Sequence, residues 1–328
     1  MTFNNPREML RAIALAAVTT VSVAMPLAVQ AQSWPQRTVK FIVPFGPGSS
    51  ADTSARIVAE KLQAQWGQAI VVEPRPGGDG MISLNAFISA NDDHTFFFGP
   101  SSTFVAHPHR YAKLSYNRER DILPIAQMST TMLAFAVPGD SKWKNLKDFI
   151  DDVRANPGKY NVAAAPGSSE MQFDGFIKSN NLQVVKVPYR DIVQAANDVT
   201  IGRLHALYAA ITIFQSQMPT GKIKVLAISG DKPASIAPGA ATAAEQGQPF
   251  LALEGLMGMF GSRATTPALR ERIAADFLKV VTDPAIAAKL GSIGQVHNPG
   301  DTVKFDASIK AQAANMALIA KTIGMQPK

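Results

Sequence analysis

The stretch FIVPFGPGSSADTSARIVAEKL, residues 41–62, joins an apolar strand to a helix through a tight turn. In the second half of the stretch, Ala55, Val58, Ala59 and Leu62 recur at helical spacing. The turn GPGSSA, residues 46–51, matches the dinucleotide-binding pattern G-x-G-x-x-G/A. Because a helix start offers unpaired N–H groups and the positive end of the helix dipole, the stretch predicts an anion-binding loop.

Strand and helix signals alternate along the rest of the chain, which indicates βαβ units, mostly parallel sheets and an α/β class. Strands are expected at residues 38–45, 69–73, 94–99, 131–138, 160–167, 182–188, 203–210 and 221–229. Helices are expected at residues 50–67, 81–90, 145–158, 168–181 and 189–202, and the chain becomes mainly helical over 266–291 and 302–324.

A second Gly/Ser turn resembles the first. APGSSEM, residues 165–171, again lies between an expected strand and an expected helix. Each turn alone is ordinary turn chemistry, with its serines acting as helix caps. Two matched turns in a chain long enough for two lobes favour a ligand cleft between them.

Composition excludes several classes of function. The 328 residues contain no cysteine, which excludes disulfides, thiolate metal sites and cysteine nucleophiles. The formal net charge of +7 suits an anionic small molecule, but there is no basic run interleaved with aromatic residues, so we expect no nucleic-acid partner.

The N-terminus has the pattern of a secretory signal. Arg7 and Arg11 precede an uncharged apolar segment, and Val29-Gln30-Ala31 offers small residues to a signal peptidase. We expect residues 1–31 to be cleaved after about Ala31, and the protein to be periplasmic. An uncleaved anchor is the alternative, but the apolar core is short for a membrane span.

Some residues near GPGSSA favour a dinucleotide-binding site, and others argue against it. Glu73 ends the second expected strand, near the place of a ribose-binding acid. Pro47 stands between the glycines and lacks an N–H group, and an exported protein meets little NAD. A carboxylate is therefore the favoured anion, and an NAD-dependent oxidoreductase is the alternative function.

Catalytic and metal motifs are weak. We find no G-x-S-x-G elbow, H-E-x-x-H or P-loop, and we expect no enzyme, no catalytic residue and no cofactor. His107 and His109 could share one side of a strand and bind zinc. Without a third ligand at suitable spacing, a surface loop is the preferred interpretation, and we expect no metal.

Several segments in order resemble the Bug family, the periplasmic solute-binding proteins of tripartite tricarboxylate transporters. They are WPQRTVKFIVPFGPGSSADTSARIVAEKL, GQAIVVEPRPGGDGMIS, GSS, VPYRD, GKIKVLAIS and the helical tail. The resemblance implies a two-lobed, type II-like flytrap with a mostly parallel sheet in each lobe. Lobe boundaries are expected at residues 32–134 and 258–328 for the first lobe and 135–257 for the second.

The resemblance also implies a function. The protein would be a monomer that captures a small organic acid, such as a di- or tricarboxylate or an aromatic acid, and delivers it to the membrane subunits of the transporter. A ligand-binding adaptor for a signalling receptor is a further alternative.

The site residues carried over from the family lie in both lobes. The first lobe would supply Phe45, Gly46, Pro47, Gly48, Ser49, Asp52, Ser101, Ser102 and Thr103. The second would supply Gly167, Ser168, Ser169, Tyr189, Arg190 and Asp191. Arg190 could clamp a distal carboxylate or be a surface charge at a helix start.

Five positions depart from the family pattern: Ser49, Met171, Asp191, His205 and Arg263. Ser49 and Asp191 replace glycines, which adds polar groups to the expected pocket. We therefore expect an unusual ligand, such as a longer acid or one that carries an amine or amide.

Overall fold

The computed structural model describes residues 34–230, 232, 234 and 236–328. The chain divides into two units, Met1–Gln36 and Arg37–Lys328, and the fold below is that of the second. The expected signal peptide, residues 1–31, lies outside the described residues. Within the described part of the chain, every helix is too short or too polar to cross a membrane.

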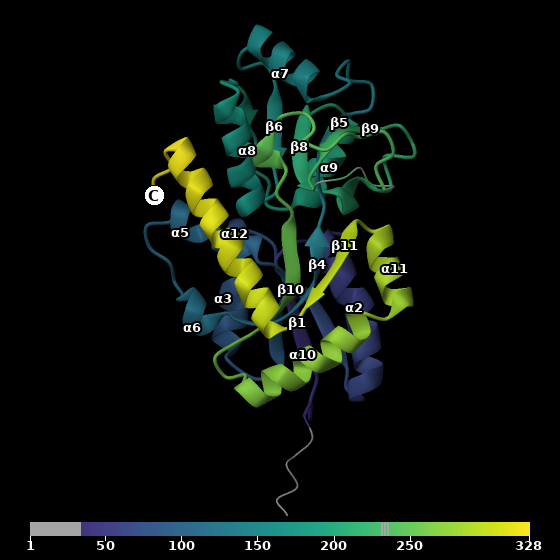
Figure 1. Ribbon diagram of the computed structural model, residues 1–328, viewed down its shortest axis with the longest axis vertical. Coiled ribbons are helices and arrows are strands. Elements are labelled where there is room, and N and C mark those ends of the chain that lie inside the picture. Colours follow the sequence, from purple (N-terminus) through teal and green to yellow (C-terminus); the bar gives the residue numbers. More distant parts are fainter. Residues whose placement is uncertain (1–33, 231, 233, 235) are drawn as a thin grey trace, which may run out of the picture. The chain divides into compact units, whose positions relative to one another are not determined.

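The first sheet is built from both ends of the unit (Figure 1). Its strands are β1 (Val39–Val43), β2 (Ile70–Pro74), β3 (Thr95–Pro100), β4 (Leu123–Thr131), β10 (Gly255–Gly261) and β11 (Gln295–Gly300). They lie in the order β11-β4-β10-β3-β1-β2. β1 pairs parallel with β2 and β3, whereas β10 and β11 run antiparallel to their neighbours.

The second sheet comes from the middle of the chain. Its strands are β5 (Leu133–Pro138), β6 (Asn161–Ala164), β7 (Val185–Lys186), β8 (Ala206–Ala210) and β9 (Ile223–Ile228). They lie in the order β7-β6-β8-β5-β9. β6 pairs parallel with β7 and β8, and β5 runs antiparallel to β8 and β9.

The α/β class is confirmed, but both sheets are mixed rather than mostly parallel in their pairing. The reason is the path of the chain between the sheets. On β5 and on β10 the chain enters one sheet directly from the other. Each of these strands therefore starts at the edge where a neighbouring strand ends, and pairs antiparallel with that neighbour.

The chain passes between the sheets twice. β4 ends at Thr131 and β5 begins at Leu133, and the chain returns to the first sheet at Gly255. We name the part around the first sheet lobe 1 and the part around the second lobe 2. The expected boundaries after residues 134 and 257 fall inside β5 and β10, so the strands change sheet slightly earlier.

Helices cover both sheets. The longer ones are α2 (Ser50–Trp66), α3 (Met81–Ala90), α7 (Leu146–Ala155), α8 (Ser168–Ser179), α9 (Ile192–Thr200), α10 (Pro267–Val281), α11 (Pro284–Ser292) and α12 (Thr302–Ile323). Shorter turns are η1 (Gly78–Gly80), α4 (Ser102–Val105), α5 (His107–Arg110), α6 (Arg118–Asp121), η2 (Ile211–Phe214) and η3 (Pro249–Leu251). The helices expected from apolar spacing at 50–67, 81–90, 168–181 and 302–324 are confirmed.

Three strands of the first sheet, β4, β10 and β11, were not expected from the sequence. β4 carries polar residues at buried positions, including Gln127 and Ser129, and therefore lacks an apolar pattern. Its polar groups find partners from β11: Gln127 donates to the Asn298 carbonyl at 2.7 Å, and Ser129 donates to Gln295 at 2.5 Å. These partners lie far away in the sequence, so local reasoning cannot pair the two strands.

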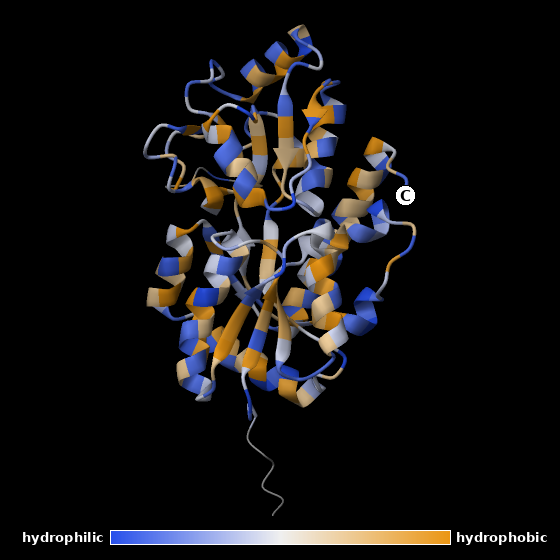
Figure 2. Cartoon of the chain, turned by 180° about the vertical axis from the view of Figure 1, so that it is seen from behind, coloured by the Kyte–Doolittle hydropathy of each residue, from blue (hydrophilic) through white to orange (hydrophobic). Residues whose placement is uncertain are grey.

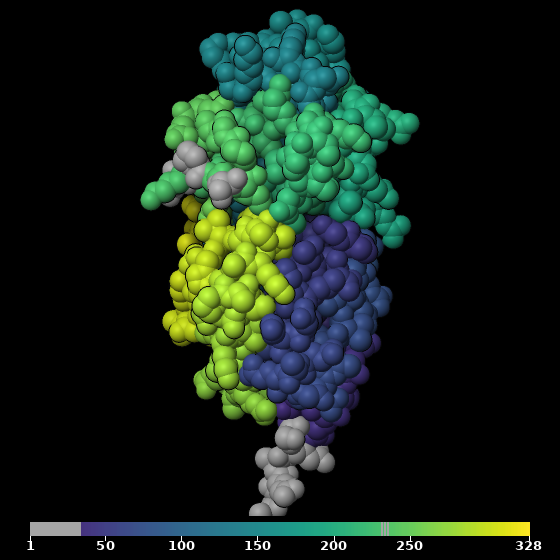
Figure 3. Space-filling model, turned by 90° about the vertical axis from the view of Figure 1, so that its right-hand side faces the viewer, coloured from purple at the N-terminus to yellow at the C-terminus, as the bar shows by residue number. Residues whose placement is uncertain are grey.

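Hydrophobic residues are concentrated along the strands, and the helices carry both hydrophobic and hydrophilic residues (Figure 2). In lobe 1, Phe260 packs against Phe104 and Phe305, with ring centroids 5.1 and 4.9 Å apart. Met171 of α8 joins this same buried cluster from lobe 2. Figure 3 shows early and late segments of the chain together in lobe 1, below the middle segments that form lobe 2.

Candidate functional site

A small cavity lies between the two lobes. The carboxyl ends of β3, β4 and β8 reach it, which is where ligands bind in open α/β sheets. Its volume is about 40 Å³, and since one water molecule needs about 10–15 Å³, it has room for only a few waters. The lining residues are Phe45, Ser49, Ser50, Ala51, Pro100, Ser102, Thr131, Leu133, Ala165, Pro166, Ser169, Ile192, Ala209, Ala210, Ile213, Gly255 and Met257.

The first predicted loop forms one wall of this cavity through Phe45 and Ser49. Ser49 is the N-cap of α2, and its hydroxyl accepts a hydrogen bond from the Asp52 N–H at 3.2 Å. Asp52 in turn accepts from the Gly48 N–H at 3.0 Å and pairs with Arg56 at 2.9 Å. Asp52 therefore holds the loop in shape, and the first turn of α2 faces the cavity through Ser50 and Ala51.

The second predicted loop forms the opposite wall, with Ser169 lining the cavity. Gly167 is the N-cap of α8 at φ 85°, a conformation that favours glycine. A Cβ on Gly167 would lie 2.6 Å from the Ser102 carbonyl oxygen of lobe 1, so the lobes touch here. Ser168 is buried beside Ser169 but does not line the cavity.

A glutamine orients the hydroxyls behind the first loop. Gln295 of β11 donates to Ser50 at 2.5 Å and accepts from Ser129 at 2.5 Å and Thr131 at 3.1 Å. All four side chains are buried. Two of them, Ser50 and Thr131, line the cavity, so β11 fixes part of its polar wall.

The Tyr189-Arg190-Asp191 segment lies beside the cavity without lining it. Arg190 is exposed and lies over the turn at Gly77 of lobe 1, where a Cβ would lie 3.3 Å from its Nε. Asp191 is the N-cap of α9 and accepts from the Val193 N–H at 3.1 Å. Its carboxylate also faces Gly46, where a Cβ would lie 2.3 Å from Oδ2.

The remaining predicted residues have packing or hydrogen-bond roles nearby. Tyr189 donates to Asp198 at 2.7 Å. Ser101 donates to Gln312 at 2.5 Å, and Thr103 packs against Gly80, where a Cβ would lie 2.3 Å from Cγ2. Pro47 and Gly48 belong to the first loop but are not among the lining residues.

Two of the departures from the family pattern lie away from the cavity. The His205 N–H donates to the Asn161 carbonyl at 2.8 Å, and its Nδ1 accepts from the Asn161 N–H at 3.0 Å. Arg263 donates to Asn91 at 3.1 Å. Neither residue is in the cavity wall.

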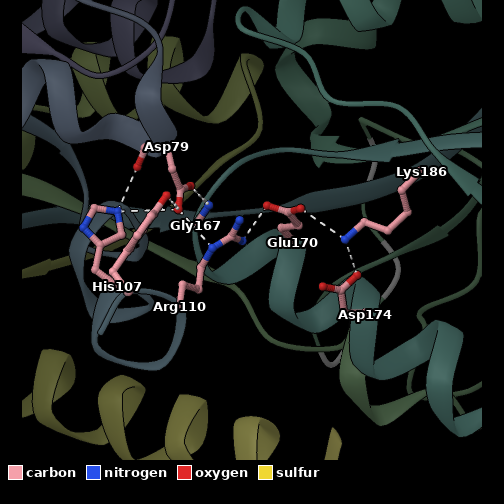
Figure 4. Close-up of polar contacts among 8 residues, drawn as sticks. Asp79, His107, Arg110, Gly167, Glu170, Asp174 and Lys186 are labelled. Carbon is pink, nitrogen blue, oxygen red and sulfur yellow. Dashed lines mark hydrogen bonds and ion pairs between the residues drawn. The ribbon is translucent and has the colours of Figure 1, made fainter. Parts of the chain in front are cut away.

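A chain of charged side chains joins the lobes beside the cavity (Figure 4). Asp79 of lobe 1 pairs with Arg110 at 3.1 Å, and Arg110 pairs with Glu170 of α8 at 2.5 Å. Lys186 continues the chain, at 3.1 Å from Glu170 and 2.5 Å from Asp174. We name these five residues the charged bridge.

The charged bridge also reaches the second loop. Asp79 Oδ1 accepts from the Gly167 N–H at 2.8 Å, so a lobe 1 carboxylate caps the start of α8. Tyr111 donates to the other Asp79 oxygen at 3.2 Å. Asp79 thereby ties the lobe 1 turn η1 to the loop that carries Ser169.

Three carboxylates share two cations in the charged bridge, and their pKa values respond differently. Burial raises the pKa of Asp79 above its ordinary value, although Arg110 and His107 act against it. Burial also opposes ionisation of Glu170, but Arg110 and Lys186 hold the pKa of Glu170 below its ordinary value. Burial raises the pKa of Asp174, with Lys186 as the opposing cation.

The expectation of a surface loop at His107 and His109 is wrong for His107. His107 begins the short helix α5 and is fully buried. Its Nδ1 lies 2.7 Å from the Tyr116 hydroxyl, and its Nε2 lies 2.8 Å from the Asp79 carbonyl oxygen. Burial lowers the pKa of His107. The contact of its ring with the Asp79 carbonyl supports the turn at Asp79.

No group of three or more metal-ligating side chains occurs among the residues that the structure describes. Glu73, the candidate ribose-binding acid, is engaged in ion pairs with Arg75 at 2.9 Å and Lys40 at 3.2 Å. The polar groups left at the cavity are hydroxyls and the starts of two helices.

Two α/β lobes around a cavity define the class of two-lobed periplasmic binding proteins, and solved structures share this fold. The periplasmic binding protein BugD superposes with a TM-score of 0.84 at 22% identity, covering 90% of this chain and 100% of that one. A protein of R. palustris solved with adipate gives a TM-score of 0.82 at 23% identity, covering 90% and 100%.

The sequence comparison gives the family. The model described as tripartite tricarboxylate transporter family receptor matches residues 54–325, and the chain belongs to this family, the TctC or Bug periplasmic solute-binding proteins. A curated relative is 28% identical over 292 residues, which cover 88% of this chain and 85% of the relative. It is the UPF0065 protein from the tcbD–tcbE intergenic region of Pseudomonas sp. strain P51.

Proposed function

We propose that this protein captures a small organic carboxylate outside the cytoplasm and delivers it to the membrane subunits of a tripartite tricarboxylate transporter. One observation carries the proposal: the starts of α2 and α8, one from each lobe, meet at a single cavity through Ser49, Ser50 and Ser169. Membership of the receptor family and the adipate-bound neighbour support the same ligand chemistry.

The two helix starts suit one carboxylate group. The first-turn N–H groups of a helix have no partner within the helix, and the dipole adds positive potential there. Hydroxyls such as those of Ser102 and Ser169 add donors that turn to meet a carboxylate oxygen. A ligand held by both starts bridges the lobes and favours the closed state.

The size of the cavity bears on how a ligand enters. At about 40 Å³ it has room for only a few water molecules, which is too little for an organic acid. The lobes already touch at Gly46 and Asp191 and at Gly167 and Ser102. We infer that the lobes separate to admit the acid, and that the observed contacts belong to a closed arrangement.

Membership of the receptor family, rather than the cavity, supports the proposed role in transport. We propose that residues 1–31 direct export and are removed after about Ala31, leaving a free periplasmic protein. Binding and release, rather than catalysis, would then be its task.

Calorimetric titration of the purified, dialysed protein tests the binding proposal. The panel contains mono-, di- and tricarboxylates, aromatic acids and NAD. For the acid that binds most tightly, Ser169→Ala should weaken binding at least tenfold, because a hydrogen bond to a charged group contributes about 1.5–3 kcal/mol.

Ser179→Ala is the matched control, because Ser179 is exposed at the far end of the same helix. It should leave the affinity unchanged. Binding of NAD alone would contradict the proposal, as would equal loss in the two variants.

A further inference from the structure

We infer that helix α8 is a latch that holds the two lobes closed before any ligand binds. This role goes beyond the proposed function, because it concerns the arrangement of the protein without a ligand. We name as the latch the contacts that four residues of lobe 2, Gly167, Glu170, Met171 and Lys178, make with lobe 1.

Met171 carries an apolar side chain of lobe 2 into the core of lobe 1. It is fully buried, and among the described residues the other buried members of its cluster belong to lobe 1. They include Phe305 and Met316 of α12, the helix that packs against α8. Separating the lobes would withdraw Met171 from this cluster and expose it to water, which is unfavourable for an apolar side chain.

The start of α8 adds polar contacts that also cross between the lobes (Figure 4). Glu170 pairs with Arg110 at 2.5 Å, and the Gly167 N–H donates to Asp79 at 2.8 Å. The side chains of Glu170 and Arg110 are only 24% and 21% exposed. Because water replaces little of what a partly buried ion pair loses, separating this pair costs more than separating a surface pair.

The far end of α8 is fastened to lobe 1 as well. Lys178 donates to the Ile323 carbonyl in the last turn of α12. Lobe 1 is therefore contacted at the start, in the first turn and in the last turn of α8. Every partner in these contacts is a group of the protein, so the latch forms whether or not a ligand is bound.

The latch bears directly on access to the cavity. In the closed arrangement the cavity has room for only a few water molecules, so an acid can enter only after the lobes separate. The strength of the latch then sets the fraction of molecules that are open to a ligand.

Spin-label distance measurements test the latch on purified protein that has been unfolded and refolded to remove carried-over ligand. Because the chain has no cysteine, labels can be attached at Lys61→Cys on α2 and Gln194→Cys on α9, two exposed positions in different lobes. We expect a single short distance, with less than about 10% of the molecules open. Arg110→Met and Met171→Gln should each raise the open fraction at least tenfold, and the double variant should be mainly open, with a longer distance.

Two variants serve as controls. Arg118 is as buried as Arg110, with a side chain 19% exposed, but it pairs with Glu119 and Asp306 inside lobe 1. Arg118→Met should therefore stay closed, as should Met171→Leu, which keeps an apolar side chain at the latch.

An unliganded wild type that is mainly open would overturn the inference. So would a double variant that stays closed, or equal opening in Arg118→Met and Arg110→Met. All of these measurements are made without an acid, so such results leave the proposed function intact. Failure of every acid of the calorimetric panel to bind would contradict the proposed function alone.

Discussion

The lobes meet at two neighbouring places with opposite chemistry. The cavity is lined by hydroxyls and hydrocarbon, whereas the charged bridge next to it contains Asp79, Arg110, Glu170, Lys186 and Asp174. Gly167 belongs to both regions, because its N–H group binds Asp79 and its loop carries Ser169. We propose that the two places have different roles: ion pairs hold the lobes together, and neutral groups hold the ligand.

Breaking the charged bridge at its centre should have the largest effect on stability. Arg110→Met leaves Asp79 and Glu170, whose side chains are 7% and 24% exposed, without their shared cation. Loss of one partner from a largely buried ion pair is expected to lower the free energy of unfolding by about 3 kcal/mol. Denaturant titration measures this change.

Lys147→Met is the control for that measurement. Lys147 also pairs with a carboxylate, Asp151, but its side chain is 82% exposed. Its loss should leave the free energy of unfolding nearly unchanged, as for other surface pairs. Similar losses in the two variants would mean that the bridge is no more than a surface ion pair.

The charged bridge, unlike the cavity, should make the free energy of unfolding depend on pH. The ionised Glu170 stabilises the fold because its pKa lies below the ordinary 4.5 in the folded state. That contribution is complete above the unfolded pKa and is lost as the pH falls through the lowered folded value.

The variant Glu170→Gln tests the contribution of the ionised Glu170 to stability. The variant should be less stable than wild type by about 2 kcal/mol at pH 7, and the difference should shrink below about pH 4.5. Denaturant titrations at several pH values measure it. A difference that stays constant down to pH 2 would assign the loss to packing rather than to charge.

The close approach of the lobes at the first loop should have a smaller effect, on affinity. A Cβ on Gly46 would lie 2.3 Å from Asp191, so Gly46→Ala must push the loop away from lobe 2. Overpacking typically costs about 1–3 kcal/mol, which predicts binding weaker by about tenfold. Calorimetry with the best acid measures the loss.

Adding Asp191→Gly to Gly46→Ala should restore most of the affinity, because the clash is removed and glycine is tolerated at an N-cap. If the double variant binds no better than Gly46→Ala alone, contact between these two residues does not limit closure.

Local pattern predicted the framework of this molecule better than its chemistry. Apolar spacing gave α2 and α8, and the matched turns placed Ser49 and Ser169 at one cavity. These features depend on neighbours in the sequence and on the shared geometry of strand–turn–helix units.

The features that could not be predicted from the sequence depend on contacts between residues far apart in the chain. Asp79 and Arg110 look like ordinary loop residues until folding places them beside Glu170. Leu133 and Ile213 reach the cavity because strands of non-consecutive order end together. The direction of Arg190, toward Gly77 rather than the cavity, is likewise set by the packing of the two lobes.

A crystal structure with the most tightly bound acid of the panel tests the central claim most directly. We predict the carboxylate between the starts of α2 and α8, about 3 Å from donors that include Ser169. An acid bound with its carboxylate away from both helix starts, or outside the cavity between the lobes, would contradict the account.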